Sequence, residues 1–220
     1  MGTEYERELK GILQADPASL QRLYKACDLL TADCIRKIEK RPFIVVRAAG
    51  SFGMDLVAIR GDISFPIEVK TSASPVIRFG GTRLAEQAED MLENCRRARV
   101  LPIYAFRLKR VRGDAWRIFT IEMQGLEGMH RLLKERLPKL RTTGQGNFVM
   151  EWEMGMPMAT FIGYLDILAG PLLNATVEEK GPLATETPTS EAPMTPTPNI
   201  APTGTQDQAD APEQPRDHQQ

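Results

Sequence analysis

The sequence predicts an α/β domain in which helices flank a mixed central sheet. Amphipathic helical patterns open the chain, β-branched runs occupy residues 43–70, and helix and strand patterns then alternate as far as residue 141. In chain order the predicted elements are α(α)βββαββα, and the sequence contains no internal repeat. With 220 residues, the chain is long enough for one such domain and an appendage.

Two capping patterns mark the first helices. Thr3 and Glu6 form a capping box in front of an apolar stripe, which predicts a helix from Glu4 to about Ala15. Asp16-Pro17 is a cap followed by proline at the first helical position, so a further helix or helix pair begins there and ends at Pro42. We therefore expect a helical insert over residues 16–42.

Three predicted strands follow, over residues 43–47, 55–60 and 63–70. The pair Gly61-Asp62 is typical of a tight turn that folds the third strand back on the second. Pro66 lies inside the third strand and cannot donate a ladder hydrogen bond. Its presence predicts an edge position or a bulge.

The remaining elements are a helix over 82–98, two strands over 100–108 and 115–121, and a helix over 126–137. A main domain is thus expected over residues 1–141. The apolar residues 142–174 are expected to form an extension that packs on this domain or on a dimer surface. Residues 175–220 are expected to form a disordered, acidic tail rich in proline and threonine.

Charge is distributed unevenly between the tail and the rest of the chain. The tail holds eight of the sixteen prolines, and its eight acidic and two basic residues give it a net charge of −6. The remaining residues carry a net charge of +5, although the whole chain is nearly neutral. The positive charge of the body suits binding to a polyanion such as DNA. The acidic tail is a separate candidate for contact with a protein partner.

Cysteine and histidine are too sparse for several common kinds of site. The cysteines Cys27, Cys34 and Cys95 lack C-x-x-C spacing, which argues against a zinc site and against a disulfide framework. This cysteine usage fits a reducing, intracellular compartment. The expected location is the cytoplasm, in association with the nucleoid. The histidines are His130 and His218, so histidine-based nucleases and Ser-His-Asp hydrolases have little to work with. The apolar stretch 154–177 contains glycines, prolines and an aspartate, so no membrane helix is expected.

The most informative residues are Asp55, Glu68 and Lys70. Because alternate side chains of a strand point to opposite faces, Glu68 and Lys70 project to the same side of the third strand. Asp55 opens the preceding strand, across the turn. A glycine-serine loop, an aspartate and a Glu-x-Lys on a hairpin indicate a magnesium site for phosphodiester cleavage.

Magnesium suits this set because it is a hard ion that takes about six oxygen ligands and keeps several waters. Asp55 and Glu68 are the expected ligands, with the Val69 carbonyl as a further candidate and manganese as a substitute ion. Lys70 is expected to stabilise negative charge in the transition state. A general-base role would need its pKa, ordinarily about 10.4, to be lowered by burial or by a neighbouring cation.

Segments around Asp55, Glu68 and Lys70, and one near the start of the chain, together resemble a known protein family. Four segments carry it: Glu6-Arg7-Glu8-Leu9, Val46-Arg47 with Ala49-Gly50-Ser51, Asp55-Leu56-Val57-Ala58, and Ile67-Glu68-Val69-Lys70. They resemble the archaeal Holliday-junction resolvases of the PD-(D/E)xK nuclease superfamily, and the similarity covers roughly residues 2–121 without the insert. It implies a restriction-endonuclease-like fold, a homodimer, and magnesium-dependent nicking of two opposing strands of a four-way junction.

The resemblance also implies a role for each matching position. The matching metal ligands are Glu6, Asp55 and Glu68, the matching catalytic residues are Lys70 and Ser51, and the matching DNA contacts are Arg7 and Arg47. The insert and the residues beyond about 142 have no counterpart in the family.

Several residues have a second interpretation. Glu6 also belongs to the capping box, and the two roles are compatible. The basic turn with Lys109, Arg110 and Arg112 either contacts DNA phosphates or is a solvated hairpin tip. The same choice between DNA and water applies to four cations of the insert, Arg36, Lys37, Lys40 and Arg41.

The sequence therefore favours a magnesium-dependent endodeoxyribonuclease that resolves four-way junctions by paired nicks. A restriction-like or repair nuclease that acts on duplex or flap DNA is an alternative with the same site. A non-catalytic DNA-binding adaptor is an alternative of another class.

Overall fold

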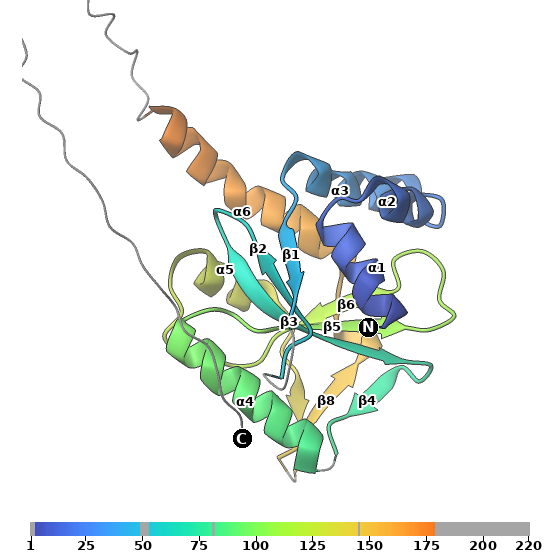
Figure 1. Cartoon of the computed structure of the whole chain (residues 1–220), viewed down its shortest axis with the longest axis vertical. Helices are drawn as coiled ribbons and strands as arrows, with labels where there is room; N and C mark the ends of the chain where they lie inside the picture. Colours follow the sequence, from blue (N-terminus) through green and yellow to red (C-terminus); the bar gives the residue numbers. More distant parts are fainter. Residues whose placement is uncertain (1–2, 49–52, 81, 145, 179–220) are drawn as a thin grey trace, which may run out of the picture. The chain divides into compact units, whose positions relative to one another are not determined.

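A six-stranded sheet in the order β1-β2-β3-β5-β6-β9 forms the centre of the fold (Figure 1). The computed structural model describes residues 3–48, 53–80, 82–144 and 146–178. The strands of this sheet are β1 (Ile44–Arg47), β2 (Leu56–Ile59), β3 (Ser64–Ser72), β5 (Ile103–Leu108), β6 (Trp116–Phe119) and β9 (Met156–Pro157). Neighbouring strands are antiparallel except β3 and β5, which run parallel. The predicted mixed sheet is confirmed.

Helices cover both faces of this sheet. In the described part of the chain they are α1 (Glu4–Leu13), α2 (Pro17–Tyr24), α3 (Leu29–Lys40), α4 (Thr82–Ala98), α5 (Gly128–Arg136) and α6 (Met158–Glu178). On one face Phe161 of α6 packs against Phe65 of β3, with ring centroids 5.9 Å apart. Glu68 of β3 points to the opposite face, where it lines a small pocket together with Gln87 and Ala88 of α4.

The insert is a pair of helices, α2 and α3, each begun by an aspartate. Asp16 accepts a hydrogen bond from the Ser19 amide at 2.8 Å, and Asp28 accepts one from the Thr31 amide at 3.0 Å. Leu20 and Leu23 of α2 and Ile35 and Ile38 of α3 pack into the main core, and α3 also lies against α6. The sequence patterns for these helices are confirmed, and the break between them falls just before Asp28.

Pro66 does not lie on an edge strand, so that prediction is wrong. β3 is flanked by β2 and β5, and the register with β2 passes through Pro66 opposite Val57 without an inserted residue. Pairing with β5 begins one residue later, at Ile67 opposite Ile103. A central strand tolerates this proline because the parallel ladder starts after it.

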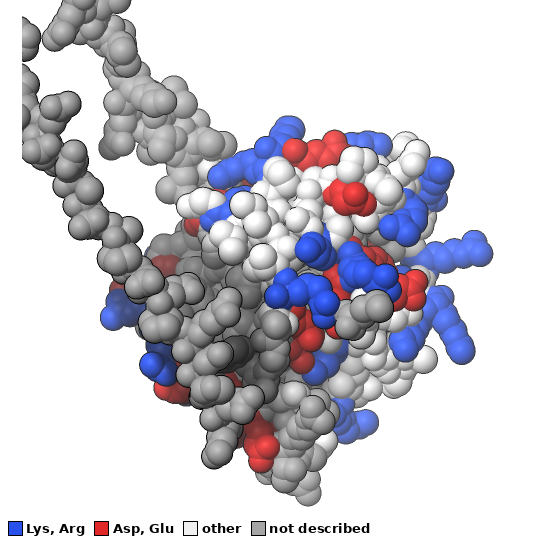
Figure 2. All heavy atoms as spheres, in the orientation of Figure 1, with Lys and Arg blue, Asp and Glu red and all other residues white. Residues whose placement is uncertain are grey.

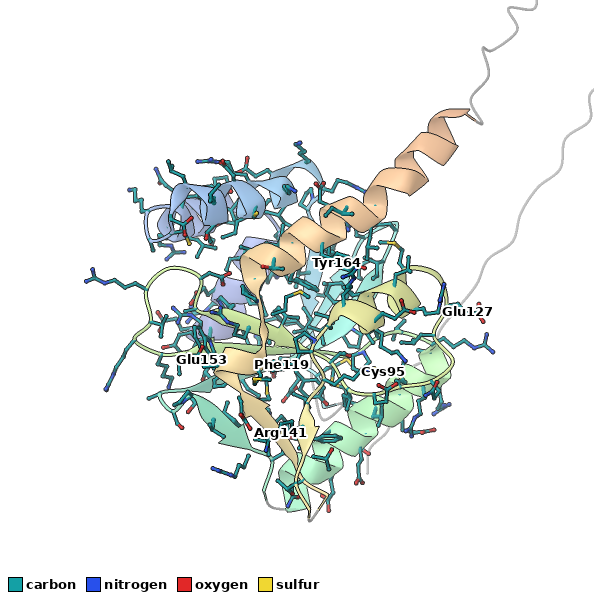
Figure 3. The ribbon with its side chains drawn as sticks, turned by 180° about the vertical axis from the view of Figure 1, so that it is seen from behind. Cys95, Phe119, Glu127, Arg141, Glu153 and Tyr164 are labelled. Carbon is teal, nitrogen blue, oxygen red and sulfur yellow. The ribbon has the colours of Figure 1, made fainter. Side chains whose placement is uncertain are left out.

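The chain beyond residue 142 completes the domain. β4 (Val76–Arg78), β8 (Phe148–Glu151) and β7 (Arg141–Thr142) form a second sheet in the order β4-β8-β7, next to a short 3₁₀ helix (Trp152–Met154). Seen from behind (Figure 3), α6 runs past α5, where the Tyr164 hydroxyl donates to the Leu132 carbonyl at 3.3 Å. α6 continues to Glu178, into the first residues of the segment predicted to form the tail, and the rest of that segment lies outside the described residues. Of the helices described, none combines the length and the apolar character needed to cross a membrane.

Candidate active site

β3 presents Glu68 and Lys70 side by side, as the alternation of strand side chains predicts. The Lys70 ammonium Nζ lies 2.5 Å from the Glu68 Oε1, and both side chains are largely buried. The register with β5 places Tyr104 directly beside Glu68. The fold therefore encloses a carboxylate and a lysine between the sheet and α4.

Asp55, just before β2, completes this group from the neighbouring strand. Its Oδ2 accepts a hydrogen bond at 2.8 Å from the amide of Val69, the residue between Glu68 and Lys70. The Asp55 amide in turn donates to the Ile67 carbonyl at 2.9 Å. These two bonds fix the aspartate against β3.

Glu6 does form the predicted capping box. Its Oε1 accepts a hydrogen bond from the Thr3 amide at 3.1 Å, while the Glu6 amide donates to the Thr3 hydroxyl at 3.2 Å. The Oε2 of Glu6 lies 3.3 Å from the guanidinium of Arg47 on β1. The Glu6 side chain is buried and close enough to Asp55 for the two negative charges to repel each other. Helix α1 therefore adds a negative charge next to the hairpin.

Burial and mutual repulsion disfavour the charged forms of the Asp55 and Glu68 carboxylates. Burial raises the pKa of Glu68 to about 7; the Lys70 charge opposes this rise and the Asp55 carboxylate adds to it. Burial also raises the pKa of Asp55, against the hydrogen bond from Val69, and the charge of Glu6 raises it further. A bound cation would relieve this repulsion, because opposite charge favours the ionised form.

The donor set fits a hard divalent cation by its chemistry, since it offers buried carboxylate oxygens. Within the described residues, no group of three or more His, Cys, Asp and Glu side chains is already arranged to hold a metal. Glu68 is engaged by Lys70, and Glu6 by Thr3 and Arg47. Asp55 and Glu68 interact directly and are the candidate pair of ligands; to share one ion with Asp55, Glu68 would have to leave Lys70 and Glu6 would have to leave its present partners.

Two aromatic residues at this site carry no signal in the sequence. Phe79 lies beneath Lys70, with the ammonium 5.8 Å from its ring centroid. The buried Tyr104 hydroxyl has no hydrogen-bond partner among the described residues. Both residues look like ordinary core aromatics, and their position at the site follows from strand pairing and from the path of the chain after β4.

Ser51, predicted as a catalytic residue, lies outside the described residues. The loop that carries it ends at Gly53, whose backbone has a φ of +68°. A Cβ atom at Gly53 would come within 2.3 Å of the Gln87 carbonyl oxygen on α4. The end of this loop therefore packs tightly on α4 beside the pocket, and only glycine fits there.

The predicted DNA contacts lie on the surface near the site. Arg7 is exposed on α1, and Lys109, Arg110 and Arg112 are exposed in the turn between β5 and β6. Arg47 is 43% exposed beside Glu6. In Figure 2 basic side chains gather on the side of the molecule where α1, α2 and this turn lie. Contact of these residues with DNA stays a prediction.

Three of the four cations of the insert pair with carboxylates. Arg36 contacts Asp33, Lys37 lies 3.6 Å from Asp166, and Arg41 lies 3.4 Å from Asp62. Such pairing favours the interpretation that these side chains stabilise the surface of the fold.

Comparisons with known proteins identify the family of the chain. A family model described as archaeal Holliday junction resolvase (Hjc) matches residues 33–167. No curated protein matches the chain. Among solved structures, Hjc from Archaeoglobus fulgidus, a Holliday junction resolvase from an archaeal hyperthermophile, is similar with a TM-score of 0.39 and 22% identity, over 70% of this chain and 96% of that one. The family match spans more than half of the chain and includes Asp55, Glu68 and Lys70. It also extends over residues 33–42 and 142–167, so the expectation that these segments have no counterpart in the family is wrong.

Proposed function

The chain belongs to the archaeal Holliday junction resolvase family, and on that premise we propose that it resolves four-way DNA junctions by paired, magnesium-dependent nicks. One observation carries the catalytic part of this proposal. Asp55 and Glu68, two partly desolvated carboxylates, stand beside Lys70 on one hairpin. This combination offers oxygen ligands and a positive charge at one point, as phosphodiester hydrolysis requires.

Asp55 and Glu68 would hold the metal ion, with Glu6 as the third carboxylate. Bound Mg²⁺ would supply positive charge and a water molecule of lowered pKa. The Val69 amide keeps Asp55 oriented, and the wall formed by Phe79 and α4 limits access of bulk water.

Lys70 is proposed to stabilise negative charge on the scissile phosphate. In the structure it is paired with Glu68, so it must leave this carboxylate to reach the DNA. A cation bound by Glu68 would replace the lysine as its counter-charge. Substrate and metal binding would thus release Lys70 for catalysis.

Paired nicks need two active sites, and we assign the second to another copy of the chain. A four-way junction has two-fold symmetry, which an isologous dimer matches. The edge strand β1 and its neighbour β2 leave three apolar side chains exposed on one face: Ile44, Val46 and Ile59 are 67%, 46% and 42% exposed. Ile44 and Ile59 are direct cross-strand partners, so this apolar surface is continuous.

Substitution of the three central residues tests the catalytic proposal. Asp55→Asn, Glu68→Gln and Lys70→Ala should each lower the rate of junction cleavage in Mg²⁺ by about 100-fold or more, because each removes charge from the reacting centre. Junction binding, measured in chelator, should stay within about threefold of the wild type. Lys139→Ala, at an exposed ion pair with Glu122, is the matched control and should cleave normally.

Three outcomes would contradict the proposal. Cleavage by the wild type that persists in chelator would exclude a metal-dependent reaction. A matched linear duplex that competes as well as the junction would favour a duplex nuclease, and binding without any cleavage would favour a DNA-binding adaptor.

A further inference from the structure

A groove lies between α1, α2 and the turn that joins β5 to β6, and its volume is about 720 Å³. Glu4, Glu8 and Ile12 line it from α1. On a helix these positions share one side, whereas Glu6 points to another side. The groove and the candidate active site therefore flank the same helix.

Besides Arg107 of β5, three arginines from three different elements line the groove: Arg7 of α1, Arg22 of α2 and Arg112 of the turn. All three are exposed, and within the described ranges none lies within ion-pair distance of a carboxylate. Arg22 bonds within its own helix, to the Ala18 carbonyl and the Ser19 hydroxyl. The negative charge of Glu8 is already matched by Arg107 at 3.1 Å and by the Trp116 indole at 3.0 Å. Glu4 is the other carboxylate that lines the groove, so the three arginines Arg7, Arg22 and Arg112 leave it with a net excess of positive charge.

Close backbone approaches hold the walls of the groove in place. A Cβ atom at Gly11 would come within 2.3 Å of the Ser19 hydroxyl, so α1 and α2 pack without room for a side chain there. At Gly113, with a φ of +77°, a Cβ atom would meet the Ala26 carbonyl at 3.1 Å, which brings the turn against the end of α2. These contacts make the groove a preformed feature of the fold.

The α1 and α2 walls precede residue 33, where the family match begins. One wall of the groove is therefore α2, which belongs to the part of the helical insert that lies outside the family match. In the insert, Arg22 is the arginine that points into the groove, while Arg36 and Arg41 contact aspartates elsewhere.

We propose that this groove binds the sugar-phosphate backbone of a junction arm next to the cleaved bond. The inference rests on the proposed function. Arginine suits this role because its guanidinium can bind two phosphate oxygens at once. A strand that crosses α1, about 10 Å wide, advances about three nucleotides at 3.4 Å each along the duplex axis. The groove would therefore contact phosphates about three nucleotides from the nick.

Binding of a fluorescent four-way junction, measured in chelator over a range of salt concentrations, tests the groove. Arg22→Ala and Arg112→Ala should each raise the Kd about 5- to 20-fold and reduce the slope of log K against log salt by about one phosphate contact. Arg22→Gln should behave like Arg22→Ala, which separates loss of charge from loss of packing. Arg131→Ala, at an exposed ion pair with Glu135 on α5, removes the same charge elsewhere and should leave the Kd within about twofold of the wild type.

Neutral methylphosphonates in the junction locate the contact. Placed about three nucleotides from the mapped nick, they should weaken binding by the wild type but have little further effect on Arg22→Ala, because the interaction is already lost. An unchanged Kd and an unchanged salt slope in Arg22→Ala and Arg112→Ala would overturn the proposal that the groove binds DNA. The wild type, assayed with Mg²⁺ in parallel, reports separately on the proposed function: junction cleavage would uphold that function even if the groove fails, and binding without cleavage would reject it.

Discussion

Glu68 is a buried carboxylate that the fold holds against Lys70. An ordinary strand glutamate would face water, but here α4 and Tyr104 close over it. Its pKa of about 7 reflects mainly this burial, which disfavours the charged form. Without a bound cation, the ionised Glu68 therefore lowers the stability of the fold. Such perturbed carboxylates are common at active sites.

Replacement of Glu68 by glutamine should stabilise the protein in chelator at alkaline pH. Because the folded-state pKa is raised above the ordinary 4.5, the contribution of Glu68 to stability is fully present below that pH and is lost as the pH rises through about 7. Glu68→Gln should thus raise the free energy of unfolding by up to about 3 kcal/mol at about pH 8 and change it little at about pH 4. Urea unfolding at both pH values measures this difference.

Glu135→Gln, at an exposed position of α5, is the control and should change the free energy of unfolding by less than about 0.5 kcal/mol. Mg²⁺ should raise the Tm of the wild type more than that of Glu68→Gln. Equal shifts of Tm would argue against Glu68 as a ligand.

At the scale of elements, the hairpin of β2 and β3 positions the site. Its turn is closed by a hydrogen bond from the Arg60 amide to the Ile63 carbonyl at 3.0 Å. Asp62 in this turn binds Arg60 through both carboxylate oxygens, at 2.6 and 2.9 Å, and lies 3.4 Å from Arg41 at the end of α3. The turn thus ties the insert to the strands that present Asp55 and Glu68.

Asp62→Asn should destabilise the fold by about 2–3 kcal/mol at neutral pH, because it leaves buried guanidinium groups without a charged partner. Burial opposes the change, but the Arg60 hydrogen bonds and charge keep the pKa of Asp62 below its ordinary value. The stabilisation is therefore present above the ordinary aspartate pKa and lost as the pH falls through the lower folded-state value. Urea titrations at neutral and acidic pH should show the difference between variant and wild type shrink as the pH falls.

Asp33→Asn provides a matched comparison, because Asp33 forms an ion pair with Arg36 at the surface. It should cost less than about 1 kcal/mol. If the two variants were equally mild, the turn would not be an anchor of the hairpin.

At the scale of the whole molecule, the apolar surface of Ile44, Val46 and Ile59 is the surface that we assign to the dimer. The opposite face of the same two strands is buried against the helices, through Val45, Leu56 and Ala58. The outward residues therefore contribute nothing to the core of one chain, and their burial against a second copy would be favourable.

Ile44→Lys combined with Ile59→Lys should convert the dimer into a monomer without unfolding it, because both side chains are exposed. Sedimentation or light scattering measures the mass. On junctions, the monomeric variant should release single nicks in place of paired nicks. Ile167→Lys, on the exposed side of α6, is the control and should remain dimeric; a wild-type chain that is monomeric with and without junction DNA would refute the assignment.

Much of this architecture could be predicted from local sequence patterns. The caps Thr3 and Asp16 and the apolar spacing behind them are short-range signals, which is why α1 and a helix or helix pair after it were predicted. The structure adds the cap at Asp28, which begins α3. The alternation of β3 likewise placed Glu68 and Lys70 on one side. α6 was not predicted because apolar residues occur on most sides of this helix, so the spacing of apolar residues shows no clear helical period.

The sequence by itself determined the class of fold, the hairpin and the identity of the charged residues, because each depends on neighbours a few positions apart. The tertiary structure alone decided that Pro66 fits a central strand, that Tyr104 lies beside Glu68, and that Arg22 faces Arg7 and Arg112 across a groove. These facts depend on strand order and on helix packing between distant segments. No local pattern encodes them, since they arise only when the whole core closes.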